Sequence, residues 1–157
     1  MEDKALLSTE VASEAEKAEL LIVIPAYNEA ENIERVVNHL TANFPQYDYV
    51  VVNDGSRDET AAICQRNGYN LLNLPVNLGL AGAFQAGLKY ADKYGYQYAV
   101  QLDGDGQHRP EYLESMIKKM EEGYDIVIGS RFVGEKKPFT MRMLGSNLIE
   151  MAIRFTN

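Results

Sequence analysis

The 157-residue sequence has one cysteine, Cys64, and no tryptophan. A single cysteine excludes an intramolecular disulfide and a cysteine-rich metal site, which favours a reducing compartment. No apolar run approaches the ~20 residues that a membrane-spanning helix needs, and the acidic N-terminus has no apolar segment of the kind found in secretory signals. We therefore expect a cytoplasmic protein, working in solution or at the cytoplasmic face of the membrane.

Two glycine-rich nucleotide motifs are also missing. No G-x-G-x-x-G follows the first apolar run, LLIVI at 20–24, and the glycines of GLAGAFQAG have the wrong spacing for a dinucleotide fold. The lysine motif of the phosphate-binding loop is absent as well. These absences exclude the two commonest ways of binding a nucleotide through a glycine-rich turn.

The net charge is −8, and half of it lies in residues 1–19, which hold six acids and two lysines. An acidic chain repels a polyphosphate backbone, so nucleic acid is not an expected partner. Residues 1–19 have few large apolar side chains, and we expect a frayed or disordered arm there. Residues 20–157 form one domain in this interpretation, which could take a small phosphorylated ligand if cations neutralise its charge.

From residue 20 onward, a β-rich run, a turn and a helical segment recur five times. The expected strands are 20–24, 47–52, 70–74, 96–102 and 125–129, and the expected helices are 29–43, 57–67, 80–94, 110–122 and 139–155. This alternation predicts an α/β fold with a mostly parallel open sheet and helices on both faces.

Local signals support the expected helix limits. The pairs Asn28 with Glu31 and Ser56 with Glu59 fit capping boxes at two helix starts. Glycines at 68, 95 and 123 fall where three helices should end.

Each unusual polar cluster follows one of the expected strands. The clusters are PAYNE (25–29), NDGS (53–56), PVNLG (75–79), DGDGQH (103–108) and GSRF (129–132). Because the carboxyl ends of parallel strands share one edge, and open α/β sheets bind ligands there, the clusters predict one site. Taken singly, each has a plainer interpretation, since Ser56 can be a helix cap, Tyr27 can cover the sheet and Arg131 can be a surface charge.

Asp103 and Asp105 are the least easily explained as simple turn residues. In an extended segment they point the same way, so their repulsion calls for a cation. Oxygen ligands from Asp105, Asp103 and Gln107 suit Mg²⁺ or Mn²⁺. A calcium loop of the helix-loop-helix type is disfavoured, because His108 stands where that loop needs glycine and Pro110 falls inside it.

These residue types fit a nucleoside diphosphate bound with a metal. The Tyr27 ring can stack on a base, the Asp54 carboxylate can accept hydrogen bonds from base N–H groups, and Arg131 can pair with phosphate. A divalent cation can stabilise a nucleoside diphosphate as it leaves. Group transfer is therefore the expected reaction class.

The motifs LIVIPAYNEAENIERVV, VVNDGSRDET, NLGLAGAFQAGLKYA, QLDGDGQHRPE and IVIGSRF together resemble the nucleotide-sugar half of a family-2 glycosyltransferase. The resemblance covers residues 20 to about 132. The forms DGDGQH and GSRF are similar to those of dolichyl- or polyprenyl-phosphate sugar transferases and polysaccharide-assembly relatives. The resemblance to the family implies a glycosyltransferase A-type, Rossmann-like fold, a UDP- or GDP-sugar donor, inversion at the anomeric carbon and a divalent metal.

The resemblance also implies roles for particular residues. The nucleotide would be bound by Pro25, Tyr27, Glu29, Asp54, Asn77, Gly79 and Asp103. Asp103, Asp105 and Arg131 would be catalytic, with Asp105 as the direct metal ligand and Gln107 as a second one. His108, Arg142 and Ser146 would contact a lipid-phosphate or glycan acceptor.

The sequence departs from the resemblance at its C-terminal end. Family members continue well beyond the point that matches Asn157, so we expect a chain shortened at its C-terminus, with membrane association through the part that follows. We find no segment similar to Asp-x-x-Ser-Gly and no evident catalytic base. A non-catalytic nucleotide- or metal-binding module is therefore the alternative to an active transferase.

Overall fold

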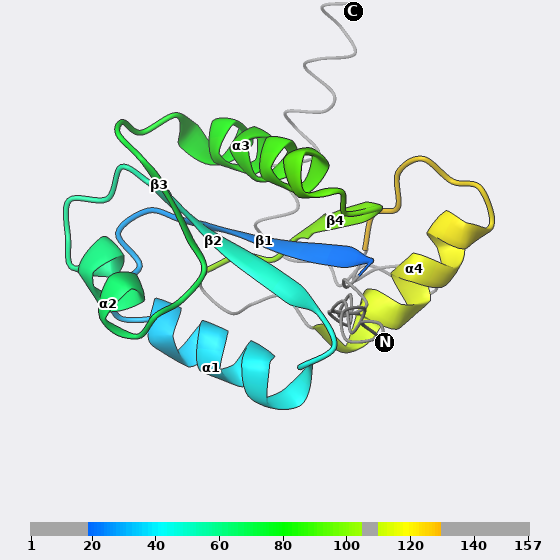
Figure 1. The fold of residues 1–157 in the computed structure, drawn as a ribbon, viewed down its shortest axis with the longest axis horizontal. Helices are drawn as coiled ribbons and strands as arrows, with labels where there is room; N and C mark the ends of the chain where they lie inside the picture. The colour runs from blue at the N-terminus through cyan, green and yellow to red at the C-terminus, as the bar shows by residue number, and fades with distance from the viewer. Residues whose placement is uncertain (1–18, 105–109, 130–157) are drawn as a thin grey trace, which may run out of the picture. The chain divides into compact units, whose positions relative to one another are not determined.

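The structure is a computed structural model that describes residues 19–104 and 110–129 (Figure 1). Its elements in chain order are β1 (Leu20–Ala26), α1 (Ile33–Asn43), β2 (Asp48–Asp54), α2 (Thr60–Arg66), β3 (Leu71–Leu74), α3 (Gly79–Tyr94), β4 (Tyr98–Gln101), the 3-10 helix η1 (Pro110–Tyr112) and α4 (Leu113–Glu121). The chain divides into two compact units, residues 1–117 and 118–157, and the sheet belongs to the first.

The four strands form one parallel sheet in the order β3-β2-β1-β4. The central strand β1 pairs with β2 from Leu21 opposite Asp48 to Ala26 opposite Asn53. Parallel neighbours require crossover connections, which the intervening helices provide. The α/β fold with a parallel sheet is thus confirmed.

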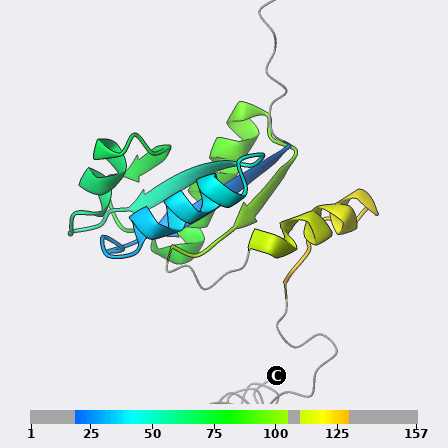
Figure 2. The same ribbon diagram turned by 90° about the horizontal axis from the view of Figure 1, so that it is seen from below.

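Alternate residues of β1 face opposite layers of helices. Leu20, Ile22 and Ile24 are buried against α1 and α2, whereas Leu21 and Val23 are buried against α3. Figure 1 shows α3 on one side of the sheet and α1 with α2 on the other, and Figure 2 shows α1 lying over the strands from below. A strand covered on both faces must be apolar at every position, which explains the run LLIVI.

The helices end where their glycines predict, but α1 and α2 begin later than expected. Gly95 adopts the left-handed conformation (φ 73°) after α3, and Gly68 and Gly123 also have positive φ. Both expected capping boxes are wrong, because the N-cap residues are Asn32 for α1 and Glu59 for α2.

The second unit is described only for residues 118–129. It contains the end of α4, where the Lys119 ammonium lies 2.7 Å from the Glu122 carboxylate. The fifth expected strand, 125–129, is wrong, since these residues form no strand and Ile126 and Ile128 are exposed. Strand propensity alone does not supply the hydrogen-bonding neighbour that a strand needs. The expected helix 139–155 and residues 1–18 of the expected N-terminal arm lie outside the described residues.

In residues 19–104 and 110–129, no helix has both the length and the apolar character needed to cross a membrane.

Candidate functional site

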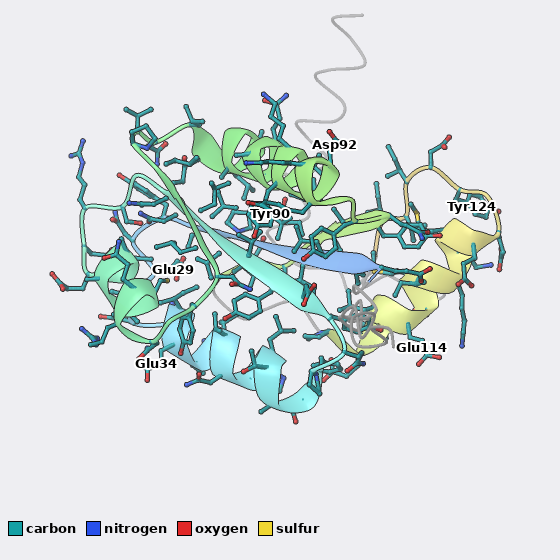
Figure 3. The ribbon with its side chains drawn as sticks, viewed as in Figure 1. Glu29, Glu34, Tyr90, Asp92, Glu114 and Tyr124 are labelled. Carbon is teal, nitrogen blue, oxygen red and sulfur yellow. The ribbon has the colours of Figure 1, made fainter. Side chains whose placement is uncertain are left out.

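The carboxyl edge of the sheet brings together the predicted polar clusters 25–29, 53–56 and 75–79 and the described part of a fourth, residues 103–104. The loops that follow β3, β2, β1 and β4 succeed one another along this edge in the order of the strands. The registers keep the strand ends level, with Ala26 opposite Asn53 and Asp54 opposite Leu74. Figure 3 shows Glu29 at this edge and Asp92 toward the opposite end of α3. The convergence expected from the sequence is therefore present for the loops after β1, β2 and β3 and for the described residues 102–104 after β4.

The loops after β2 and β3 are joined through Asp54. Its carboxylate Oδ1 accepts a hydrogen bond of 2.7 Å from the Leu78 backbone N–H, and the side chain is only 3% exposed. At Gly55 a Cβ atom would lie 2.7 Å from backbone atoms of Val76 and Asn77. Asp54 therefore has a structural role in addition to the predicted contact with a base.

Asn77 and Gly79 lie in the same region, at the start of α3. The Asn77 Oδ1 accepts a 3.0 Å hydrogen bond from the Gly79 backbone N–H, and Gly79 has a φ of 76°. The predicted nucleotide contacts of these two residues thus fall next to Asp54.

The loops after β1 and β2 exchange hydrogen bonds at Asn28. The Asn28 N–H donates to the Ser56 Oγ at 3.0 Å, and the Arg57 N–H donates to the Asn28 Oδ1 at 2.9 Å. Asn28 has a φ of 57°, the left-handed conformation that asparagine tolerates better than most residues. Asn28 and Ser56 therefore connect two loops instead of capping their own helices.

Two more amides of the β1 loop are held in the same way. The Glu29 N–H donates to the Thr60 Oγ1 at 2.9 Å, and the Ala30 N–H donates to the Asp58 Oδ2 at 3.1 Å. The Asp58 Oδ1 accepts from both the backbone N–H and the hydroxyl of Thr60. Desolvation acts to raise the pKa of Asp58, but these hydrogen bonds outweigh it and hold that pKa below its ordinary value.

Sequence reasoning missed Asp58 and Thr60. The available signal is the stretch SRDET (56–60), in which four of five side chains can accept a hydrogen bond shortly after a strand end, and Thr60 is fully buried although it is polar. Nothing in the sequence indicates which loop those acceptors meet, because their partners lie about thirty residues away.

Three of the predicted nucleotide residues belong to the end of β1 and its loop. Pro25 is buried in the strand, whereas the Tyr27 side chain is 42% exposed, as a stacking platform must be. The Glu29 Oε2 accepts a 2.9 Å hydrogen bond from the Asn32 Nδ2.

The loop after β4 lies against that same segment. The half-buried Asp103 accepts a 2.9 Å hydrogen bond from the Gln101 Nε2. A Cβ on Gly104 would lie 3.1 Å from the Pro25 carbonyl oxygen and 3.5 Å from the Glu29 Cγ. The space at Gly104 is therefore used by the β1 segment of this chain.

Of the predicted metal ligands only Asp103 lies within the described residues. The others, Asp105 and Gln107, fall outside them, as do His108, Arg131, Arg142 and Ser146. Over residues 19–104 and 110–129, no three His, Cys, Asp or Glu side chains are grouped as a metal site. The donor atoms that the sequence offers, carboxylate and amide oxygens, have the chemistry that Mg²⁺ and Mn²⁺ prefer.

Comparison with known proteins gives consistent results. A family model described as Glycosyl transferase family 2 matches residues 21–156. The polyprenol monophosphomannose synthase of Mycolicibacterium smegmatis is 34% identical over 119 residues, which cover 72% of this chain and 45% of that protein. The undecaprenyl-phosphate mannosyltransferase of Micrococcus luteus is also 34% identical over 119 residues, covering 73% and 49%.

A solved structure supports the same assignment. S. aureus TarS 1–349 in complex with UDP aligns with a TM-score of 0.52 and 25% identity, over 78% of this chain and 38% of that chain. The present chain spans about half the length of the curated relatives it matches. Because the family model covers most of the chain, and the parallel sheet and its loops agree with it, the chain belongs to glycosyl transferase family 2.

Proposed function

We propose that this chain is the donor-binding part of a metal-dependent, inverting glycosyltransferase that uses a UDP- or GDP-sugar. The observation that carries this proposal is the grouping of Tyr27, Glu29, Asp54 and Asp103 along one sheet edge in a family-2 chain. The match to a structure that contains UDP supports a nucleoside diphosphate as the ligand class.

The nucleoside would lie over the loops after β1 and β2. Tyr27 is exposed and offers its ring to the base, while Pro25 and Glu29 form the neighbouring wall. Asp54 holds Leu78 with Oδ1, so a base N–H would be accepted by the remaining capacity of this carboxylate. Asn77 and Gly79 would border the same pocket.

The diphosphate would lie toward the loop after β4. Asp103, Asp105 and Gln107 would hold Mg²⁺ or Mn²⁺, and Arg131 would pair with phosphate. When bound, the ion would supply Lewis-acid stabilisation of the diphosphate leaving group. An acidic chain needs such a cation, because carboxylates alone repel the ligand.

We infer a polyprenyl phosphate or a cell-envelope glycan as the acceptor, and the names of the two relatives favour the first. In a single inverting displacement, an acceptor oxygen bonds to the anomeric carbon. The bond from that carbon to the diphosphate oxygen breaks, and the nucleoside diphosphate leaves with the electron pair. An ionised phosphate has no proton to lose in this step, whereas a sugar hydroxyl requires a base. His108, Arg142 and Ser146 remain the predicted acceptor contacts, at a cytoplasmic membrane surface.

Isothermal titration with UDP and GDP, with and without Mn²⁺, tests donor binding. We expect one nucleotide to bind in a metal-dependent manner, and Asp103→Asn and Asp105→Ala to weaken it by about tenfold or more, since each removes a charged ligand. Asp92→Asn, which removes an equal charge from the opposite end of α3, should leave affinity unchanged. Binding of neither nucleotide, or binding indifferent to metal, contradicts the proposal.

Turnover separates the transferase from its alternative. Nucleoside diphosphate release from UDP- and GDP-sugars would be measured with and without undecaprenyl phosphate. Acceptor-dependent release supports transfer, while metal-dependent nucleotide binding without release supports a non-catalytic module.

A further inference from the structure

Three consecutive backbone amides of the loop after β1 are each bound by a side chain from the loop after β2 or from the first residue of α2. Asn28 N–H donates to Ser56, Glu29 N–H to Thr60 and Ala30 N–H to Asp58, at 2.9 to 3.1 Å. We call the four side chains Asn28, Ser56, Asp58 and Thr60 the inter-loop network. It joins the residues that immediately follow Tyr27 to a different segment of the chain.

The network holds the backbone of Asn28 in a left-handed conformation that non-glycine residues seldom adopt. Asn28 stands at φ 57°, and its own Oδ1 accepts from the Arg57 N–H at 2.9 Å. Non-glycine residues adopt this region at a cost, and they stay there when surrounding contacts determine it. The position of Tyr27 relative to Asp54 therefore depends on hydrogen bonds made by neither of them.

The effect extends to the loop after β4. The backbone N–H of Glu29 is one of the three amides that the network binds. The Cγ atom of the same residue lies 3.5 Å from the position that a Cβ on Gly104 would take. A shift of the 28–30 backbone would thus move both the exposed Tyr27 and the Glu29 side chain, which lies against Gly104 beside Asp103.

Asp58 is suited to this role because it is exposed and is not a member of the hydrophobic core. Water can replace it as a hydrogen-bond acceptor, so the hydrophobic core does not require it. It nevertheless joins both halves of the network, through Oδ2 to Ala30 and through Oδ1 to Thr60.

We propose that Asp58 is a positioning residue for the nucleotide donor, which holds the 28–30 loop in its binding conformation without touching the ligand. This inference rests on the proposed function. It assigns to a side chain outside the predicted pocket a share of the affinity for the nucleoside diphosphate.

The test uses the full chain, labelled with ¹⁵N, as parent, Asp58→Ala, Asp58→Asn and Glu59→Ala. Hydrogen exchange of the Glu29 and Ala30 amides reports on the network without ligand. Isothermal titration with UDP and GDP in Mn²⁺ reports on positioning. Glu59→Ala is the matched control, because it removes the same charge one residue away. Glu59 is exposed, and although it is the N-cap residue of α2, its side chain makes no capping hydrogen bond.

We expect Asp58→Ala to exchange these amides faster and to bind nucleotide about tenfold more weakly. Asp58→Asn should restore part of the affinity, since asparagine has one oxygen and can place it either at the Oδ2 position facing Ala30 or at the Oδ1 position facing Thr60. Glu59→Ala should match the parent. If Asp58→Ala loses its dispersed spectrum, the spectrum and affinity of Asp58→Asn decide the question.

If the parent binds nucleotide, two results would overturn this inference and leave the proposed function standing. The first is faster amide exchange in Asp58→Ala with unchanged affinity, and the second is unchanged exchange. A parent that binds neither nucleotide is a different result, which overturns the proposed function and this inference with it.

Discussion

At Gly55 the backbone has a φ of 65°, and a Cβ would lie 2.7 Å from the Val76 carbonyl carbon and from the Asn77 nitrogen. Real Cβ atoms do not approach backbone atoms so closely, so the residue must remain a glycine or the 75–78 loop must move. Because Asp54 binds Leu78 in that same loop, Gly55 controls how tightly the second and third loops of the carboxyl edge can pack.

Gly55→Ala is therefore expected to destabilise the fold by roughly 2–4 kcal/mol, from left-handed strain plus overpacking. Gly68→Ala is its matched control, since Gly68 has a φ of 66° with no atom within 4 Å of the added carbon. That variant should lose only about 1 kcal/mol. Urea unfolding of both measures the difference, and equal losses would show that the close approach to Val76 and Asn77 contributes nothing.

Single residues also mark the limit of what the sequence could predict about the site. The sequence predicts the edge at which Tyr27 and Asp54 lie because each stands at a strand end, Tyr27 directly after β1 and Asp54 as the last residue of β2. Asp58 is not identified from the sequence, since its partner in the 28–30 loop is the backbone N–H of Ala30, a residue with no distinctive side chain. A backbone amide leaves no mark in the sequence, so its partner has to be found in the structure.

Among the elements, the strands and helix ends were more predictable than the helix starts. A helix end such as Gly95 is set locally, because the chain there needs a residue that accepts positive φ. The start of α1 was expected at 29 and lies at Ile33, since residues 28–30 give their amides to another loop. The run 125–129 shows the converse error, in which good strand propensity has no described pairing partner.

The opposite edge of the sheet offers a prediction at the element scale. Tyr96, just before β4, donates its hydroxyl to the Asp48 Oδ2 at 2.8 Å, where β2 begins. Burial raises the pKa of Tyr96, and the hydrogen bond to Asp48 raises it further. The folded state thus favours the neutral phenol, so its stabilising contribution is complete below the unfolded pKa of about 10 and is lost as the pH rises above it.

Tyr96→Phe should accordingly lower the free energy of unfolding near pH 8 by about 1 kcal/mol, through the lost hydrogen bond. The same change should flatten the decline of stability above pH 10. Some decline will remain, because burial also raises the pKa values of Tyr49, Tyr69 and Tyr90. Denaturant unfolding between pH 8 and pH 11 measures both effects. Tyr112→Phe, at an exposed site, is the control, and an unchanged slope in Tyr96→Phe would contradict the assignment.

For the whole molecule, charge determines how an anionic ligand can bind. The chain carries −8, of which residues 1–19 hold half, and a nucleoside diphosphate adds further negative charge. The described part of the four loops at the carboxyl edge offers carboxylates and one cationic side chain, Arg57, so we expect a divalent cation to supply most of the attraction for the diphosphate. Binding should then require base recognition and metal together, and neither alone should be sufficient.

Thermal unfolding of the intact chain tests this requirement. A ligand at about 100 times its dissociation constant stabilises the folded state by about 2.7 kcal/mol, which for a chain of this size raises Tm by roughly 5–10 °C. We expect that shift with Mn²⁺ and either UDP or GDP, and its loss in EDTA. Adenosine diphosphate with Mn²⁺ has the same charge and a different base, so it is the matched ligand control. An equal shift with adenosine diphosphate would mean that metal and phosphate alone account for binding, and that Tyr27 and Asp54 do not select the base.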